Sequence, residues 1–282
     1  MIREKMMKAG CILAALLSVV AVLMISLFLF GNGIPAIAEI GFSDFIFGRI
    51  WRPSNNEFGI FPMIVGSLYV TALAILIGVP VGLFSAIYLS YFCSDKVYKI
   101  VKPAMELLAG IPSIVYGLFG LVVIVPLFQR LFPGTSGKSV LTASVILAIM
   151  ILPTIITVSE SSIRSVPENI YHGALALGCT KENAVMKAVL PAASSGVVSA
   201  IILGIGRAIG ETMAVIMIAG NQPVIPNSLL SGVRTLTANI VLEMGYAADL
   251  HRDALIATAV VLFVFILIIN LSFSALKRKS KK

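Results

Sequence analysis

Charged residues are scarce in this sequence. They make up 12% of the 282 residues, whereas soluble proteins carry about a quarter. Hydrophobic residues make up 59% of the chain. This composition excludes an ordinary soluble domain and predicts a protein that lies in a lipid bilayer, with enough length for several membrane spans.

Histidine and cysteine are also rare, which bears on catalysis and metal binding. His172 and His251 fall on opposite predicted sides of the membrane, and no acid pair or Cys-His pair is spaced for chemistry. The cysteines Cys11, Cys93 and Cys179 all fall on the predicted inner side, where thiols stay reduced. The sequence therefore predicts no enzyme site, no metal site and no disulfide.

One segment imitates a nucleotide-binding loop. The stretch "PGTSGKS" at 133–139 contains a Gly-Lys-Ser triplet. Such a loop needs a glycine five residues before its Gly-Lys pair, and Phe132 occupies that position. The segment is predicted to be an outer turn between two spans, so the chain has no expected ATP site of its own.

Long apolar runs are abundant. A span takes about 20 residues, and the runs that reach this length are 12–30, 64–92, 105–131, 140–159, 195–220 and 254–276. Pro80, Pro112 and Pro126 are expected to kink or break the second and third runs. We predict an all-α membrane protein with six transmembrane helices, divided into an anchor helix and outer segment at 1–60 and a core at 61–282.

The basic residues predict the orientation of the spans. Fourteen of the 21 Lys and Arg residues fall on inner segments and six on outer segments if both termini are cytoplasmic, as the positive-inside rule favours. The first run is too long for a cleaved signal peptide and is expected to remain as an anchor. The C-terminal "LKRKSKK" is expected to bind anionic lipid, so the net charge of +8 requires no nucleic acid partner.

The inner segment at 160–194 is the most informative loop. Its apolar residues recur at helical spacing on both sides of Gly178, and the pattern ends at Pro191. This predicts a helix, a glycine turn and a second short helix. The alternative is one amphipathic helix on the membrane surface.

Within that segment, "ALALGCTKENAVMKAVLPAA" resembles the coupling loop of ABC importer permeases. The residues that match or mark the motif are His172, Ala174, Gly178, Leu190 and Pro191. His172 departs from the family pattern, because an acidic residue usually opens the motif. The resemblance implies that this loop docks in a groove of a cytoplasmic ATPase subunit.

A second resemblance spans most of the chain from residue 45 onward. The stretches that carry it are "FIFGRIWRPSNNEFGIFP" (45–62), "GIPSIVYGLFG" (110–120) and "GRAIGETMAV" (206–215). They resemble the PstC-type permeases of phosphate-specific ABC importers, whose fold is the type I (MetI-like) permease bundle. The resemblance implies a bacterial or archaeal inner-membrane protein that forms half of a translocation pathway.

The same resemblance implies a set of partners. These are a second, PstA-type permease, a PstB-type ATPase dimer and a PstS-type phosphate-binding protein outside the membrane. ATP and Mg would be bound by the ATPase, and no cofactor by this chain. Two alternatives remain open from the residues alone: a permease for another oxyanion such as sulfate or molybdate, and a secondary transporter driven by an ion gradient.

Two charges interrupt the fifth run, Arg207 and Glu211. A charge near the centre of a span costs about 2.5–3.5 kcal/mol on insertion scales, so each should face protein or water. Four residues apart on a helix, they would lie on one face and compensate each other. Either Arg207 meets phosphate in the pathway, with Glu211 and Thr212 beside it, or the two charges form a structural ion pair.

Small residues run beside these charges at every fourth position: Gly196, Ala200, Gly204, Ala208 and Thr212. This stripe predicts the close approach of another helix. In the outer loop 221–253, helical spacing predicts an interfacial or re-entrant helix. The outer arginines Arg49, Arg52 and Arg234 are interpreted as solvated loop residues, with contact to an acidic rim of the binding protein as the alternative.

Overall fold

The computed structural model describes residues 2–279, with side chains for residues 6–272. The predicted lipid anchor at 276–282 therefore lies outside the described side chains. The helices of the first half are α1 (Ile2–Ile40), α2 (Phe42–Phe47), α3 (Phe61–Ile87), α4 (Asp95–Gly110), α5 (Ser113–Phe119), α6 (Val125–Leu131) and α7 (Val140–Arg164).

The second half is equally helical. Its helices are α8 (Glu168–Ala176), α9 (Lys181–Ala184), α10 (Leu190–Ala192), α11 (Ser194–Gly210), α12 (Met213–Ile218), α13 (Leu236–Glu243) and α14 (Asp249–Lys279). Short π-helical turns occupy Tyr88–Phe92, Gly120–Ile124 and Val185–Val189, and a two-stranded hairpin pairs β1 (Trp51–Arg52) with β2 (Glu57–Phe58).

The helical membrane bundle predicted from the sequence is confirmed. In the described part of the chain, five helices are long and apolar enough to cross a membrane, and up to six if a bent pair counts as one span. The five are Met6–Ile40, Phe61–Phe92, Ser113–Leu131, Val140–Arg164 and Asp249–Ser272. The bent pair joins Lys181–Ala192 to Ser194–Gly210 at 74°.

The third span differs from the predicted run 105–131. The chain breaks at Ile111 and Pro112, so the span begins at Ser113. Proline disfavours a helical conformation of the residue before it, and Ile111 is accordingly extended, with ψ 127°. By contrast, α3 continues through Pro80, and Pro126 lies at the start of α6, directly after a π-helical turn.

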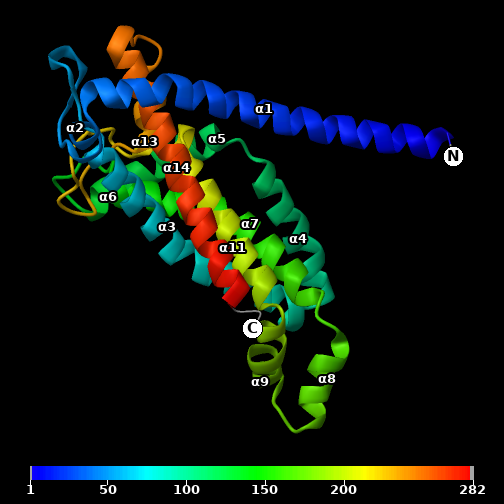
Figure 1. Ribbon diagram of the computed structural model, residues 1–282. Helices are drawn as coiled ribbons and strands as arrows, with labels where there is room; N and C mark the ends of the chain where they lie inside the picture. The colour runs from blue at the N-terminus through cyan, green and yellow to red at the C-terminus, as the bar shows by residue number, and fades with distance from the viewer. Residues whose placement is uncertain (1, 280–282) are drawn as a thin grey trace.

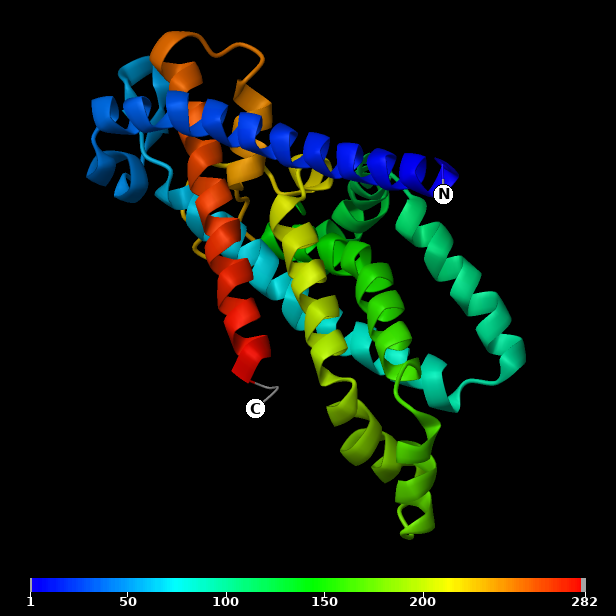
Figure 2. The same cartoon turned by 45° about the vertical axis from the view of Figure 1, so that its right-hand side comes forward.

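The core of the bundle is a three-helix contact of α3, α7 and α11 (Figures 1 and 2). Ile155 of α7 lies between Gly82 of α3 and Gly204 of α11: a Cβ on either glycine would lie 2.8 to 3.0 Å from atoms of its side chain. A Cβ on Gly196 would collide with Ser162 of α7. The predicted seam of small residues is therefore present, and the helix that it contacts is α7 of the same chain.

The first helix departs from the bundle. Figures 1 and 2 show that α1 does not run along the other long helices but lies across the end of the bundle opposite α8 and α9, with its C-terminal part against α14. Gly33 permits that contact, since a Cβ there would lie 2.6 Å from Val260. Residues 6–25 are exposed throughout, so within this chain their apolar side chains have no cover.

The predicted helix, glycine turn and short helix of the inner segment are confirmed. They are α8, a turn at Gly178 with φ +84°, and α9. A positive φ strains most residues other than glycine, which explains the glycine there. Together α8 and α9 extend beyond the bundle at the lower end of Figure 1. Valines of the π-helical turn Val185–Val189 pack with Ile163 and Val197, linking this segment to α7 and α11.

The α7 seam yields a stability prediction with a matched pair. Gly82→Val places new atoms against Ile155, and overpacking of this kind costs about 1–3 kcal/mol. Gly206→Val introduces the same residue into a helix where a Cβ meets nothing within 4 Å. We expect only Gly82→Val to lower the thermal unfolding midpoint of the detergent-solubilised chain by several degrees. Equal losses for both variants would contradict the close packing described here.

Candidate functional site

Helix α11 has two different faces. Ala200, Gly204 and Ala208 are buried against α7. On the other face, Leu203 is 54% exposed, and a Cβ at Gly206 or Gly210 would meet nothing within 4 Å. Arg207 lies on this open face and is half-buried. Arg207 thus lies outside the row of small residues, and its partly exposed side chain can be met by a second subunit or by water.

The predicted pairing of Arg207 with Glu211 is wrong. Helix α11 ends at Gly210, and Glu211 is extended, with ψ 132°. The Oε1 of Glu211 accepts a hydrogen bond from the Ala214 backbone N–H at 3.2 Å, which is one of the free N–H groups that begin α12. These N–H groups stabilise a carboxylate, so Glu211 is held by the break in the helix rather than by Arg207.

Arg207 has a different partner. Its Nη1 donates to Thr154 Oγ1 of α7 at 3.3 Å, and no ion pair involves it among the described side chains. The remaining guanidinium donors are therefore free of carboxylates within the described part of the chain. An anion could take them without first displacing an acid.

Thr212 also leaves its predicted position in the stripe, because it lies beyond the end of α11. Its Oγ1 donates to the Gly210 carbonyl at 3.2 Å, and Thr237 of α13 donates to the Glu211 carbonyl at 3.0 Å. The two carbonyl groups at the break are therefore hydrogen-bonded by threonine side chains. Arg207, Glu211 and Thr212 remain within one short stretch, but they do not share a helix face.

Of the residues singled out in the inner segment, His172 and Ala174 lie on α8, Gly178 lies in the turn after it, and Leu190 and Pro191 lie on α10. Ala174 and Leu190 are half-buried, and His172 and Pro191 are exposed. The ring of His172 lies 5.5 Å from that of Tyr171. At the tip, Leu177 is 88% exposed.

A buried carboxylate that the sequence analysis missed lies at the inner end of α7. Glu160 is 2% exposed and pairs with Lys102 of α4 at 2.5 Å and with Arg164 at 2.6 Å. Tyr98 donates to it at 3.0 Å, and burial together with this bond raises the pKa of the Tyr98 hydroxyl. This cluster attaches α4 to the helix that leads into α8.

A second buried carboxylate corrects the interpretation of one outer arginine. Arg234 is not solvated: it pairs with Glu243 of α13 at 2.5 Å, and its side chain is 15% exposed. Trp51 of the hairpin and His251 of α14 also bind Glu243, at 2.8 and 2.9 Å. The signal in the sequence was Glu243 itself, the one acid within an apolar helical pattern.

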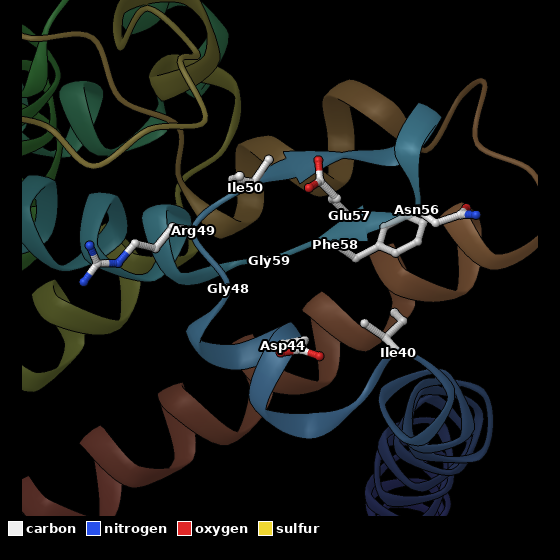
Figure 3. A pocket seen from close by; sticks show the side chains of 9 residues that line it. All are labelled: Ile40, Asp44, Gly48, Arg49, Ile50, Asn56, Glu57, Phe58 and Gly59. Atoms are coloured by element: carbon white, nitrogen blue, oxygen red, sulfur yellow. The ribbon is translucent and has the colours of Figure 1, made fainter.

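Arg49 and Arg52 are exposed, as the solvated interpretation predicts. Arg49 lines an open pocket of about 340 Å³ at the hairpin, together with Asp44 and Glu57. Figure 3 shows the Arg49 side chain extending away from Glu57 and Asn56, which lie on the other side of the pocket. The Arg49 guanidinium and the Glu57 carboxylate are thus directed to different sides of the pocket, and the residues that line it form no cluster that resembles a catalytic site.

Comparison with known proteins agrees with this geometry. The family model for the binding-protein-dependent transport system inner membrane component matches residues 78–282. The chain belongs to this family. The matched region contains the α7–α11 seam, both helices of the inner segment and the break at Glu211, so these features belong to the core of a binding-protein-dependent permease.

Individual relatives support the same assignment. The chain is 34% identical to the probable ABC transporter permease protein YqgH of Bacillus subtilis, over 99% of this chain and 92% of that protein. It is 35% identical to the phosphate transport system permease protein PstC of Mesorhizobium japonicum, over 91% of this chain and 84% of that protein.

Two solved transporters show the same fold. The MetNI methionine transporter matches with a TM-score of 0.65 at 19% identity, over 83% of this chain and 100% of that chain. A bacterial alginate transporter matches with a TM-score of 0.64 at 16% identity, over 99% of each chain. The predicted MetI-like permease fold is thereby confirmed.

The Glu160 cluster gives a second prediction. Removing the charge of Glu160 leaves Lys102 and Arg164 without their counter-charge, and because these side chains are 22% and 44% exposed, the cost lies below the roughly 3–5 kcal/mol of a fully buried pair. We expect Glu160→Gln to loosen α4, which contributes no fully buried residue to the bundle. Limited proteolysis between α3 and α4 should then become faster than in the parent protein. Glu106→Gln, an exposed position on α4, is the control, and an equal increase there would contradict a specific role for Glu160.

Proposed function

We propose that this chain is the membrane-spanning permease subunit of an ATP-driven, binding-protein-dependent importer of inorganic phosphate, in which it forms half of the translocation pathway. The observation that carries the substrate is the similarity to PstC permeases, at 33–36% identity over 88–93% of this chain. Arg207 supports it, because a guanidinium with free donors matches the oxygens of phosphate.

The open face of α11 fits a half-pathway. Charge exposed to lipid is costly, so Arg207 requires water or a second protein surface on that side. A second, PstA-type permease facing α11 would supply the other wall. In this arrangement Gly206 and Gly210 leave room for the anion, and Glu211 stays bound to α12, where it limits how strongly the anion is held.

The remaining partners follow from the same proposal. A PstB-type ATPase dimer, which binds ATP and Mg, would dock on α8 and α9, and its closure would move α7 and α11 through the valines packed between them. A PstS-type binding protein would deliver phosphate at the opposite end, near the hairpin. The distribution of Lys and Arg would place both termini in the cytoplasm, and anionic lipid would meet the C-terminal run.

Reconstituted transport tests the substrate and the role of Arg207. Proteoliposomes would contain this chain, its partner permease, the ATPase and the binding protein, and uptake of labelled phosphate would be measured with and without ATP on the ATPase side. We expect ATP-dependent uptake that Arg207→Gln reduces by about 10²-fold, the size of the loss when one donor that stabilises an anion is removed. Assembly and ATPase binding should be unchanged.

Two outcomes would overturn this proposal. Uptake that needs only an ion gradient would identify a secondary transporter, and competition by sulfate or molybdate as strong as that by phosphate would identify another oxyanion as substrate. Thr154→Val is an informative companion variant, because it removes the hydroxyl to which Arg207 donates without removing the charge. We expect it to weaken uptake less than Arg207→Gln.

Docking of the ATPase is tested by crosslinking. Cys179 follows the turn at Gly178 and is exposed, so after replacement of Cys11 and Cys93 by serine it is a unique thiol. We expect a short bifunctional reagent to join Cys179 to the co-expressed ATPase. A cysteine at Ser136, exposed at the opposite end of the bundle, should give no product. Failure at Cys179 and at neighbouring positions would exclude this docking surface.

A further inference from the structure

Glu243 is the most extensively bound carboxylate of the outer end. Its Oε2 accepts from Trp51 Nε1 and lies 2.9 Å from His251 Nε2, and its Oε1 pairs with Arg234. The three partners come from the hairpin, from α14 and from the loop before α13. One buried side chain therefore joins the hairpin, 192 residues away in the sequence, to α14 and to the loop before its own helix.

The other end of the same helix contacts the pathway residues. Thr237, in the first turn of α13, donates to the Glu211 carbonyl at 3.0 Å, and the Leu236 N–H donates to Ser67 of α3 at 3.0 Å. An eight-residue helix is about 12 Å long. Helix α13 thus reaches from the hairpin to the break between α11 and α12.

The polar groups around Arg234 are incompletely used. Arg234 donates to Asn239 Oδ1 and to the Asn221 carbonyl, while Asn239 Nδ2 and Asn221 Oδ1 are buried without a protein partner. Neither amide can be flipped, since Arg234 only donates and the Ile216 carbonyl, bound by Asn221 Nδ2, only accepts.

Arg234 thus links α13 to the segment just beyond α12, through Asn239 and the Asn221 carbonyl. Helix α13 is bound at both of its ends, to the hairpin through Glu243 and to the break between α11 and α12 through Thr237. A rigid helix that is bound at both ends can carry a movement from one end to the other.

We propose that Glu243 is a positioning residue that ties the hairpin to α13, so that a shift of the hairpin moves α13 and, through Thr237, the backbone at Glu211. The inference rests on the proposed function, in which the binding protein meets the hairpin and Glu211 borders the phosphate pathway. Contact at the outer surface is thereby transmitted to the break in the pathway helix.

The first experiment needs no transport. Trp51 is the single tryptophan of the chain, so its fluorescence in the purified full chain reports on the Glu243 cluster. Thr237→Val removes the contact at the far end of α13. We expect it to raise the acrylamide quenching constant of Trp51, because the hairpin is held less firmly once α13 is released at its far end. Thr135→Val, a half-buried residue in the outer turn after α6, should leave quenching unchanged.

The second experiment uses the assembled transporter. We expect Glu243→Gln to reduce stimulation of ATP hydrolysis by the phosphate-loaded binding protein by about tenfold, with basal hydrolysis unchanged. The double variant with Thr237→Val should be no worse than the more impaired single variant, because residues on one route are not additive.

The outcomes separate this inference from the proposed function. If the wild type is not stimulated by the phosphate-loaded binding protein, the proposed function fails, and Trp51 quenching still decides whether α13 transmits. Unchanged quenching in Thr237→Val, or additive losses in the double variant, would overturn the inference and leave Glu243 as a local anchor of the hairpin. Equal loss of basal and stimulated hydrolysis in Glu243→Gln would do the same.

Discussion

The close approach of α11 to α7 is the interaction on which the functional geometry depends. Only small residues on α11 allow the two helices to share Ile155 with α3, whereas Leu203 and Gly210 on another face of α11 are exposed. Arg207 lies at the edge of that face, half-buried and bonded to Thr154 of α7. Close packing within the subunit and an open face toward a second subunit therefore belong to one helical pattern, in which small residues occupy the side that faces α7.

Buried carboxylates play a comparable role at the two ends of the bundle. Glu160 holds α4 to α7 at the end near α8, and Glu243 holds the hairpin, α13 and α14 together at the other end. An unpaired charge in such a site is strongly destabilising, so each carboxylate fixes its partners more strictly than apolar contacts of similar area would. The segments between them, including α11 and α12, contain no such cluster among the described side chains.

The membrane bundle, the order of its spans and the helical inner segment could be predicted from the sequence, because hydropathy and helical period are local properties. The pairing of Arg207 with Glu211 could not. It assumed that a helix continues through Gly210, whereas Glu211 is stabilised more by the free N–H groups of α12 than by its neighbour on the preceding turn. The clusters at Glu160 and Glu243 were also missed, since their partners lie as far as 192 residues away in the sequence.

The break at Glu211 has a physical rationale in the proposed transporter. A continuous helix would carry Glu211 onto the face of Arg207, where the two charges would neutralise each other and leave little attraction for an anion. Ending α11 at Gly210 directs the carboxylate to α12 and leaves the guanidinium with Thr154, a neutral partner. The same break exposes a backbone carbonyl that α13 can bind. The interruption of the helix thus has two consequences: it separates the two charges, and it gives α13 a carbonyl to bind. As a result, Arg207 and the attachment point of α13, which is tied to the hairpin, lie within a few residues of each other in the chain.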